Sequence, residues 1–175
     1  IAVLGVIPKD ELLGAVTVRE LVEHLPAKPL CCEKALDKLI VHFVVGAMGV
    51  ASAAKYFRQL ADKAVITGGD RPDIQLAALE TSTKCLILTG NLRPSPIIMG
   101  RAEEVGVPMI LVRQDTLTAV EVIERFFGKT RFHLAKKVER FGEMLDDRFN
   151  YDLLYEGLGL ERALDQGEMS LSGPQ

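Results

Sequence analysis

The sequence lacks several features that mark catalytic domains, and it lacks the long apolar run of a membrane-spanning helix. The phosphate-binding pattern G-x-x-x-x-G-K-[ST] and the nucleophile-elbow pattern G-x-S-x-G are both absent. The few histidines and cysteines are scattered without the spacing of a metal site. There is no signal peptide, and no apolar run reaches the ~18 residues of a membrane span. These absences argue against a P-loop within this chain, a serine-nucleophile elbow, a metal centre and a membrane partner.

The cysteines are few, and the net charge of the chain is small. Cys31, Cys32 and Cys85 are odd in number and have no framework spacing, which predicts reduced thiols and a cytoplasmic protein. Cys85 lies in an apolar run and is expected in the core. The formal net charge is -3, and charges of both signs are interspersed. This balance argues against a nucleic-acid partner.

From residue 39 onward, short apolar runs alternate with helical patterns. Strands are predicted at residues 40–45, 64–67, 86–89 and 109–112, and helices at 50–60, from 72, at 97–105 and at 116–127. Nearly continuous apolar strands are typical of a parallel sheet that is covered on both faces. The alternation therefore predicts an α/β fold with a doubly wound, mainly parallel sheet, flanking helices and a helical C-terminal tail.

The N-terminal segment differs from this middle part. Residues 1–8 read as a buried strand that a proline closes, and the chain begins with isoleucine, as a fragment from within a longer protein would. Thr17 and Glu20 have the spacing of a helix capping box. Pro26 and Pro29 then indicate a connection that leads to Leu30.

Glycine and polar residues concentrate in the loops that follow the predicted strands, where open parallel sheets bind their ligands. Pro72 suits the first turn of a helix, so Asp70 and Arg71 come just before a helix N-terminus, which favours an anion. No catalytic residue and no metal ligand is predicted. The predicted ligand-binding residues are Thr67, Gly68, Gly69, Asp70, Arg71, Thr89, Gly90, Asn91, Asp115 and Thr116.

Each of these features also has a purely structural interpretation. The two glycines before Asp70 permit a positive φ and a close backbone approach, or they serve only a tight turn. Asp70 either caps the helix, pairs with Arg71, or orients Arg71 toward a phosphate or carboxylate. Asn91 tolerates the left-handed geometry of a simple turn, and Asp115 reads as a helix N-cap.

Two separated motifs resemble the DRTGG domain, a family named for an Asp-Arg pair and a later Thr-Gly-Gly. The pair is Asp70-Arg71 within residues 66–78, and the later triplet is Thr89-Gly90-Asn91, which departs from the family at its last position. The resemblance spans roughly residues 30–140. Residues 1–25 resemble the end of a dethiobiotin-synthetase-like P-loop domain, which implies a parent in the phosphotransacetylase family.

The resemblance implies a division of the chain into four parts. These are the end of a preceding P-loop-like domain or linker (1–29), the DRTGG α/β domain (30–133), a helical tail (134–165) and a flexible terminus (166–175). Partners of the DRTGG domain would be its own N-terminal P-loop domain and a second copy of the chain, with a dimer expected. Apolar tail residues either mediate this association or pack on the chain's own core; they are Leu153, Leu154, Tyr155, Leu158 and Leu160.

The function implied by the resemblance is a non-catalytic regulatory domain that senses a ligand and promotes oligomerisation. The ligand class would be a nucleotide or another anionic metabolite. Two alternatives stay open. The chain could form part of the active site of a P-loop, ATP-dependent dethiobiotin-synthetase-like enzyme or of an acetyl-phosphate-forming acetyltransferase, or it could be a purely structural dimerisation domain.

Overall fold

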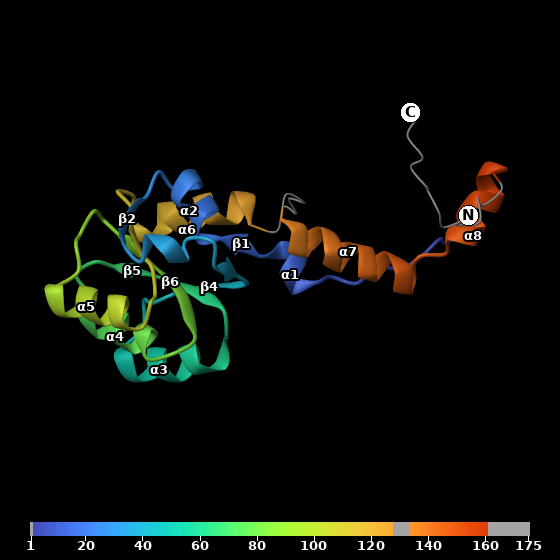
Figure 1. The fold of residues 1–175 in the computed structure, drawn as a ribbon. Helices are drawn as coiled ribbons and strands as arrows, with labels where there is room; N and C mark the ends of the chain where they lie inside the picture. The colour runs from blue at the N-terminus through green and yellow to red at the C-terminus, as the bar shows by residue number, and fades with distance from the viewer. Residues whose placement is uncertain (1, 128–133, 161–175) are drawn as a thin grey trace, which may run out of the picture.

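The computed structural model describes residues 2–127 and 134–160, and a five-stranded sheet lies at its centre (Figure 1). The strands stand in the order β2-β7-β6-β5-β4. Strands β4 to β7 are parallel to one another, whereas β2 runs antiparallel to β7. This architecture confirms the predicted α/β fold with a mainly parallel sheet. The strands are β2 (Lys28–Cys31), β4 (His42–Val45), β5 (Lys63–Gly68), β6 (Thr83–Thr89) and β7 (Met109–Leu111).

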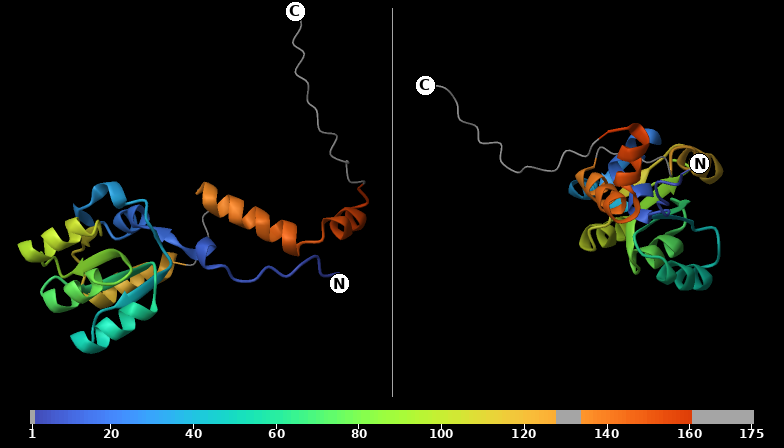
Figure 2. Two further views of the ribbon diagram at one scale, coloured as in Figure 1. Left: turned by 60° about the horizontal axis from the view of Figure 1, so that its bottom comes forward. Right: turned by 90° about the vertical axis from the view of Figure 1, so that its right-hand side faces the viewer.

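Helices cover both faces of this sheet (Figures 1 and 2). One face carries α3 (Val50–Gln59), α4 (Pro72–Leu79) and α5 (Pro96–Glu104), and the other carries α2 (Val18–His24) and α6 (Thr116–Phe126). Adjacent residues of β5 explain why the middle of the strand, Ala64 to Ile66, is apolar without alternation. Val65 packs with the core on the face of α3, α4 and α5, whereas Ala64 and Ile66 pack with the core on the opposite face.

Local sequence signals set the helix starts. The predicted capping box is present at α2: the backbone N–H of Glu20 donates to the Thr17 hydroxyl over 3.1 Å, and the backbone N–H of Thr17 donates to the Glu20 carboxylate over 2.7 Å. Pro72 occupies the first turn of α4, as predicted, and Pro96 does the same in α5.

The interpretation of the segment from Pro26 to Leu30 as a connection is wrong from Lys28 onward. Residues Lys28–Cys31 form β2, in which Pro29 pairs with Ile110. Proline is tolerated there because β2 is an edge strand with a single neighbour. The predicted strand at 40–45 is also divided at Val41. Its first part, β3 (Leu39–Ile40), pairs with β1 (Val16–Thr17) in a separate antiparallel ribbon.

The expected buried strand at residues 1–8 is wrong over its described part. Val3 and Val6 are 70% and 73% exposed, and regular pairing is limited to one bridge between Gly5 and Phe149. This segment runs outward from the body beside α7 (Ala135–Arg148) and ends near α8 (Tyr151–Leu158) (Figure 2). Its apolar residues thus follow a projecting helix rather than enter the sheet.

Helices α7 and α8 together form a projecting arm, residues 134–160, and polar contacts attach this arm to the N-terminal segment. Arg140 pairs with Asp10 over 2.9 Å, and the Lys137 ammonium donates to the carbonyl of Ala15, just after α1 (Glu11–Gly14). Helix α8 has no buried residue, so the apolar tail does not pack on the core as one interpretation required. The predicted domain boundaries stay a prediction, and the whole of the predicted flexible terminus (166–175) lies outside the described residues.

None of the helices in the described part of the chain combines the length and the apolar character that crossing a membrane requires.

A single turn of 3-10 helix, Glu33–Ala35, completes the elements between β2 and β3.

Candidate functional site

The loops that follow β5, β6 and β7 are joined to one another at the carboxyl edge of the sheet. The Thr89 and Thr116 hydroxyl oxygens lie 2.8 Å apart, and the Thr89 hydroxyl also lies 3.4 Å from the carbonyl oxygen of Thr67. The backbone N–H of Gly90 donates to the carbonyl of Gln114 over 2.8 Å. These contacts bring the predicted threonines of three successive strand–helix units together.

Gly69, directly after β5, is required by close approach and not by a positive φ. A Cβ atom at Gly69 would lie 1.7 Å from the carbonyl oxygen of Leu92, so the two loops touch through their backbones. Gly68 and Gly69 are not among the described glycines with positive φ, which corrects that part of the interpretation. Gly90 and Asn91 do adopt left-handed conformations, with φ of 75° and 56°.

The left-handed backbone explains the departure from the family pattern at Asn91. Asparagine and glycine are the residues that most readily adopt a positive φ. The turn after β6 therefore keeps its conformation with asparagine in the place of the family's last glycine. The Asn91 backbone N–H donates to the carbonyl of Val112 over 2.9 Å, which ties this turn to the end of β7.

Arg71 is held by its own chain. Its guanidinium forms a two-pronged pair with Asp73, with both N–O distances at 3.0 Å, and it also donates to the Met48 carbonyl over 3.4 Å. The Arg71 hydrogen bond lowers the pKa of the Asp73 carboxyl below its ordinary value. Arg71 thus joins the start of α4 to the loop before α3, and its predicted role in ligand binding stays a prediction.

Asp115 forms the predicted N-cap of α6. Its carboxylate accepts from the Thr118 backbone N–H over 3.0 Å and from the Thr118 hydroxyl over 2.8 Å. These hydrogen bonds lower the pKa of the Asp115 carboxyl. Behind the Gly68 loop, buried Gln75 donates from its side-chain amide to the Gly68 carbonyl over 2.9 Å. Both side chains position loops in this conformation.

A cavity of about 650 Å³ opens at the same edge of the sheet. Of the predicted site residues, Asn91 lines it, opposite residues 26–28, which the sequence analysis had not placed beside this loop. The cavity is lined by Pro26, Ala27, Lys28, Asn91, Arg93, Leu111 and Arg113.

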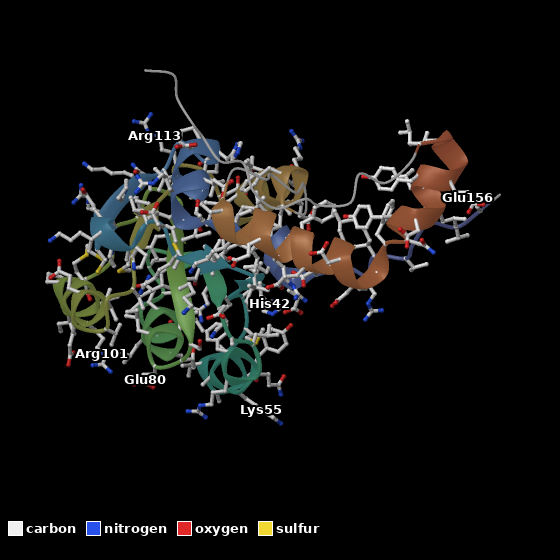
Figure 3. The ribbon with its side chains drawn as sticks, turned by 45° about the vertical axis from the view of Figure 1, so that its right-hand side comes forward. His42, Lys55, Glu80, Arg101, Arg113 and Glu156 are labelled. Atoms are coloured by element: carbon white, nitrogen blue, oxygen red, sulfur yellow. The ribbon has the colours of Figure 1, made fainter. Side chains whose placement is uncertain are left out.

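The antiparallel direction of β2 places Lys28 in this cavity. Lys28 begins β2 and pairs with Leu111 at the end of β7, so the start of one strand lies beside the finish of the other. Arg93 follows β6 and Arg113 follows β7. Figure 3 shows Arg113 at the top of the body, far from Arg101 on the lower helices.

The positive charge of the cavity is not neutralised from within. No carboxylate is among its lining residues, and within residues 2–127 and 134–160 no ion pair involves Lys28, Arg93 or Arg113. The Gln114 side-chain amide lies 3.5 Å from the Leu25 carbonyl and links the two walls. Arg93 and Arg113 lie in loops that follow predicted strands, but neither was among the predicted binding residues. Lys28 was not predicted either, because β2 was not.

Two of the thiols, Cys31 and Cys85, do not offer nucleophiles at neutral pH. Burial raises the pKa of Cys31 to about 11, and it raises that of the fully buried Cys85 further still. Cys85 lies in the core, as predicted, and all three cysteines are unbridged. The described residues also contain no group of His, Cys, Asp and Glu that could hold a metal ion. The site is therefore a cationic surface cavity beside hydrogen-bonded loops.

Comparisons with known proteins identify one domain family and two longer proteins that resemble this chain. The sequence model of the DRTGG domain matches residues 20–126. A phosphate acetyltransferase of Synechocystis sp. is 35% identical over 113 residues, which are 61% of this chain and 16% of that protein. A phosphate acetyltransferase of Nitratidesulfovibrio vulgaris is 28% identical over 134 residues, 71% of this chain and 19% of that protein. The chain thus spans less than a fifth of the length of either relative.

A solved structure shares the fold. It contains the CBS and DRTGG domains of the regulatory region of a Clostridium perfringens pyrophosphatase, complexed with the activator diadenosine tetraphosphate. The TM-score is 0.56 and the sequence identity is 22%, with 84% of this chain and 65% of that chain covered. At this identity the likeness concerns the fold alone.

Proposed function

This chain belongs to the DRTGG domain family, and we propose that it is a non-catalytic regulatory module of a phosphotransacetylase-family protein that binds a small anionic metabolite. The ligand would bind at the carboxyl edge of the sheet. Ligand binding would then change the activity of the other parts of the larger protein.

The cationic cavity is the observation that carries this proposal. Its volume of about 650 Å³ lies within the range of about 300–1,000 Å³ that small-molecule sites occupy. Lys28, Arg93 and Arg113 supply charge without a carboxylate among the lining residues to oppose it. Three uncompensated cations around a concave surface favour an anionic ligand. Asn91 adds a side chain that both donates and accepts hydrogen bonds.

The predicted loop residues fit this site as its supporting wall. Thr89 and Thr116 fix the loop that carries Asn91, and Gly69 permits the close packing of Leu92 against the preceding loop. A direct contact of Asp70 or Arg71 with the ligand is also part of the proposal. It would require Arg71 to leave its pair with Asp73.

The relatives are compatible with a regulatory role. Both are phosphate acetyltransferases much longer than this chain, and the structural neighbour comes from the regulatory region of a pyrophosphatase bound to a nucleotide activator. By analogy we propose a nucleotide or another phosphate-bearing metabolite as the ligand. The activity of the larger protein is proposed on the same ground.

We also propose that the module self-associates, with a dimer as the expected state. The exposed apolar residues of the arm support this proposal, because Leu158 and Leu160 at its end are 61% and 56% exposed. Burial of such side chains on a second copy would remove apolar surface from water.

The regulatory proposal is tested by thermal unfolding of this chain with a panel of metabolites. Nucleotides, sugar phosphates and tricarboxylates are compared with neutral nucleosides and sugars of the same size. We expect at least one anion to raise Tm in a concentration-dependent way, because a ligand that binds only the folded state stabilises it. The proposal fails if no anion raises Tm, or if Arg93→Ala/Arg113→Ala responds as the wild type does.

A further inference from the structure

The cavity has charge but no flat apolar surface. Its lining contains Lys28, Arg93 and Arg113 together with Asn91 and three small or aliphatic residues, and it contains no aromatic side chain. Nucleobases are commonly held by stacking on aromatic rings, in addition to hydrogen bonds with their edges. The lining of this cavity offers no such ring.

The three cations come from three separate segments. Lys28 begins β2, Arg93 lies between β6 and α5, and Arg113 follows β7. Each arginine presents a planar fork that matches two phosphate oxygens, whereas the lysine supplies a compact charge. A chain of two or three phosphate groups has several oxygens along its length and can satisfy separate cations at once. A single phosphate has fewer oxygens with which to do so.

The walls that present these cations are held in place before any ligand arrives. The turn after β6 is tied to the segment after β7 through two backbone hydrogen bonds, from Gly90 to Gln114 and from Asn91 to Val112. Gln114 in turn reaches the carbonyl of Leu25, on the other side of the cavity. Such preorganisation reduces the conformational entropy that binding costs.

We infer that this cavity recognises the oligophosphate group of its ligand, and does not recognise the base or other group attached to it. The inference rests on the proposed function and narrows it to pyrophosphate- and triphosphate-bearing compounds. The attached group would extend through the open side of the cavity toward solvent or toward another part of the larger protein.

Isothermal titration calorimetry with this chain tests the inference, using sodium tripolyphosphate, ATP, adenosine and inorganic orthophosphate, all without divalent metal. We expect tripolyphosphate and ATP to bind with affinities within about threefold of each other, because both present the same phosphate chain to the cations. Orthophosphate should bind more weakly, and adenosine should not bind. The affinity should fall as salt rises, since exposed charges are screened.

Matched arginine variants locate the binding. Arg93→Ala and Arg113→Ala should each weaken tripolyphosphate binding by about tenfold or more, the range expected for a charged hydrogen-bonded contact. Arg101→Ala is the control, because Arg101 lies on α5 and pairs with Glu104 away from the cavity. It should bind tripolyphosphate as the wild type does. Unchanged far-ultraviolet circular dichroism and Tm confirm that each variant is folded.

Two results would overturn the inference without touching the proposed function. One is ATP binding that tripolyphosphate does not reproduce, and the other is a tricarboxylate that binds in the cavity while both phosphate compounds do not. Tripolyphosphate binding that survives Arg93→Ala and Arg113→Ala would also overturn it, because the phosphate chain would then lie elsewhere. If no anion of any class binds, the proposed function itself is wrong.

Discussion

The hydroxyl oxygens of Thr89 and Thr116 lie 2.8 Å apart and join the last residue of β6 to the first residue of α6. Thr89 is only 3% exposed, so its hydroxyl has little access to water. Its other close oxygen, the carbonyl of Thr67, is 3.4 Å away. The pair therefore adds a side-chain contact to the two backbone hydrogen bonds that hold the Gly90–Asn91 turn at the sheet edge.

Replacing Thr116 by valine removes this contact without a large change in shape. We expect Thr116→Val to lower the free energy of unfolding by about 1 kcal/mol, because a buried hydroxyl loses its shortest hydrogen bond. Thr116→Ser keeps the hydroxyl and should lose less. Urea denaturation of the two variants measures the difference. Equal stability of the valine and serine variants would show that the hydroxyl contact contributes nothing.

Gly69 and Gly100 form a matched pair for testing the close approach between loops. Gly69→Ala should destabilise strongly, because its Cβ would meet the backbone oxygen of Leu92 at 1.7 Å and force the loops apart. Gly100 lies within α5, and a Cβ atom added there would have no neighbour within 4 Å. Gly100→Ala should therefore stabilise the protein by up to about 1 kcal/mol. Differential scanning calorimetry checks both signs, and a neutral Gly69→Ala would contradict the observed contact.

Lys63 should make stability rise at alkaline pH. Its side chain is fully buried at the start of β5, and burial lowers its pKa to about 8. The unfolded chain keeps this proton up to about pH 10.4. The folded state releases the proton first, so its stability increases from about pH 8 to 10.4 and this gain is lost as pH falls through 8.

The Lys63→Met variant isolates this effect from all other titrations. The stability of the wild type minus that of Lys63→Met should grow between pH 7 and pH 10, as measured by urea denaturation at each pH. The growth should be of the order of 1–3 kcal/mol. Lys55→Met, an exposed lysine on α3, is the control and should show a constant difference. A constant difference for Lys63→Met as well would contradict the lowered pKa.

Arg71→Ala distinguishes a structural from a ligand-binding role. From its contacts with Asp73 and Met48 we expect a small drop in Tm that is the same with and without anionic ligand. Asp73→Ala should produce a similar drop, and the double variant should lose little more than either single variant. Loss of the ligand-induced rise in Tm in Arg71→Ala alone would instead support the direct contact predicted from the sequence.

Association is checked by sedimentation velocity at micromolar concentrations. We expect a dimer for the chain and a monomer for Leu158→Asp/Leu160→Asp, because charges on these exposed positions would have to be buried at the interface. Glu156→Asp changes little on the same helix and is the control. A monomeric wild-type chain at high micromolar concentration would contradict the association proposal.

The parallel part of the sheet could be predicted from the sequence, whereas its antiparallel edge strand could not. The four apolar runs from Ile40 to Val112 are continuous because both faces are covered, and this signal is strong. Lys28–Cys31 gave no such signal, since Pro29 reads as a break and only pairing with β7 makes it a strand. The short β1–β3 ribbon was equally hidden, because a two-residue strand has no periodicity to read.

The candidate site was predictable to the level of loops. Parallel strands deliver their following loops to one edge, and this rule correctly brought Thr89 and Thr116 together. The rule cannot say which loop side chains face a cavity. Arg93 and Arg113 face the cavity because β2 forms its opposite wall, whereas Arg71 pairs with the carboxylate of Asp73.

The antiparallel edge strand has a consequence for how the fold opens. Strand β2 has a single neighbour in the sheet, and its detachment would carry Lys28 away from Arg93 and Arg113. A ligand that contacts these three cations would bind β2 and the end of β7 at the same time. It would therefore stabilise the attachment of the N-terminal part of the domain to β7. Amide hydrogens of β2 would then exchange more slowly when the cavity is occupied. The stabilising effect of a bound ligand would then extend along the segment that leads back through α2 to the projecting arm.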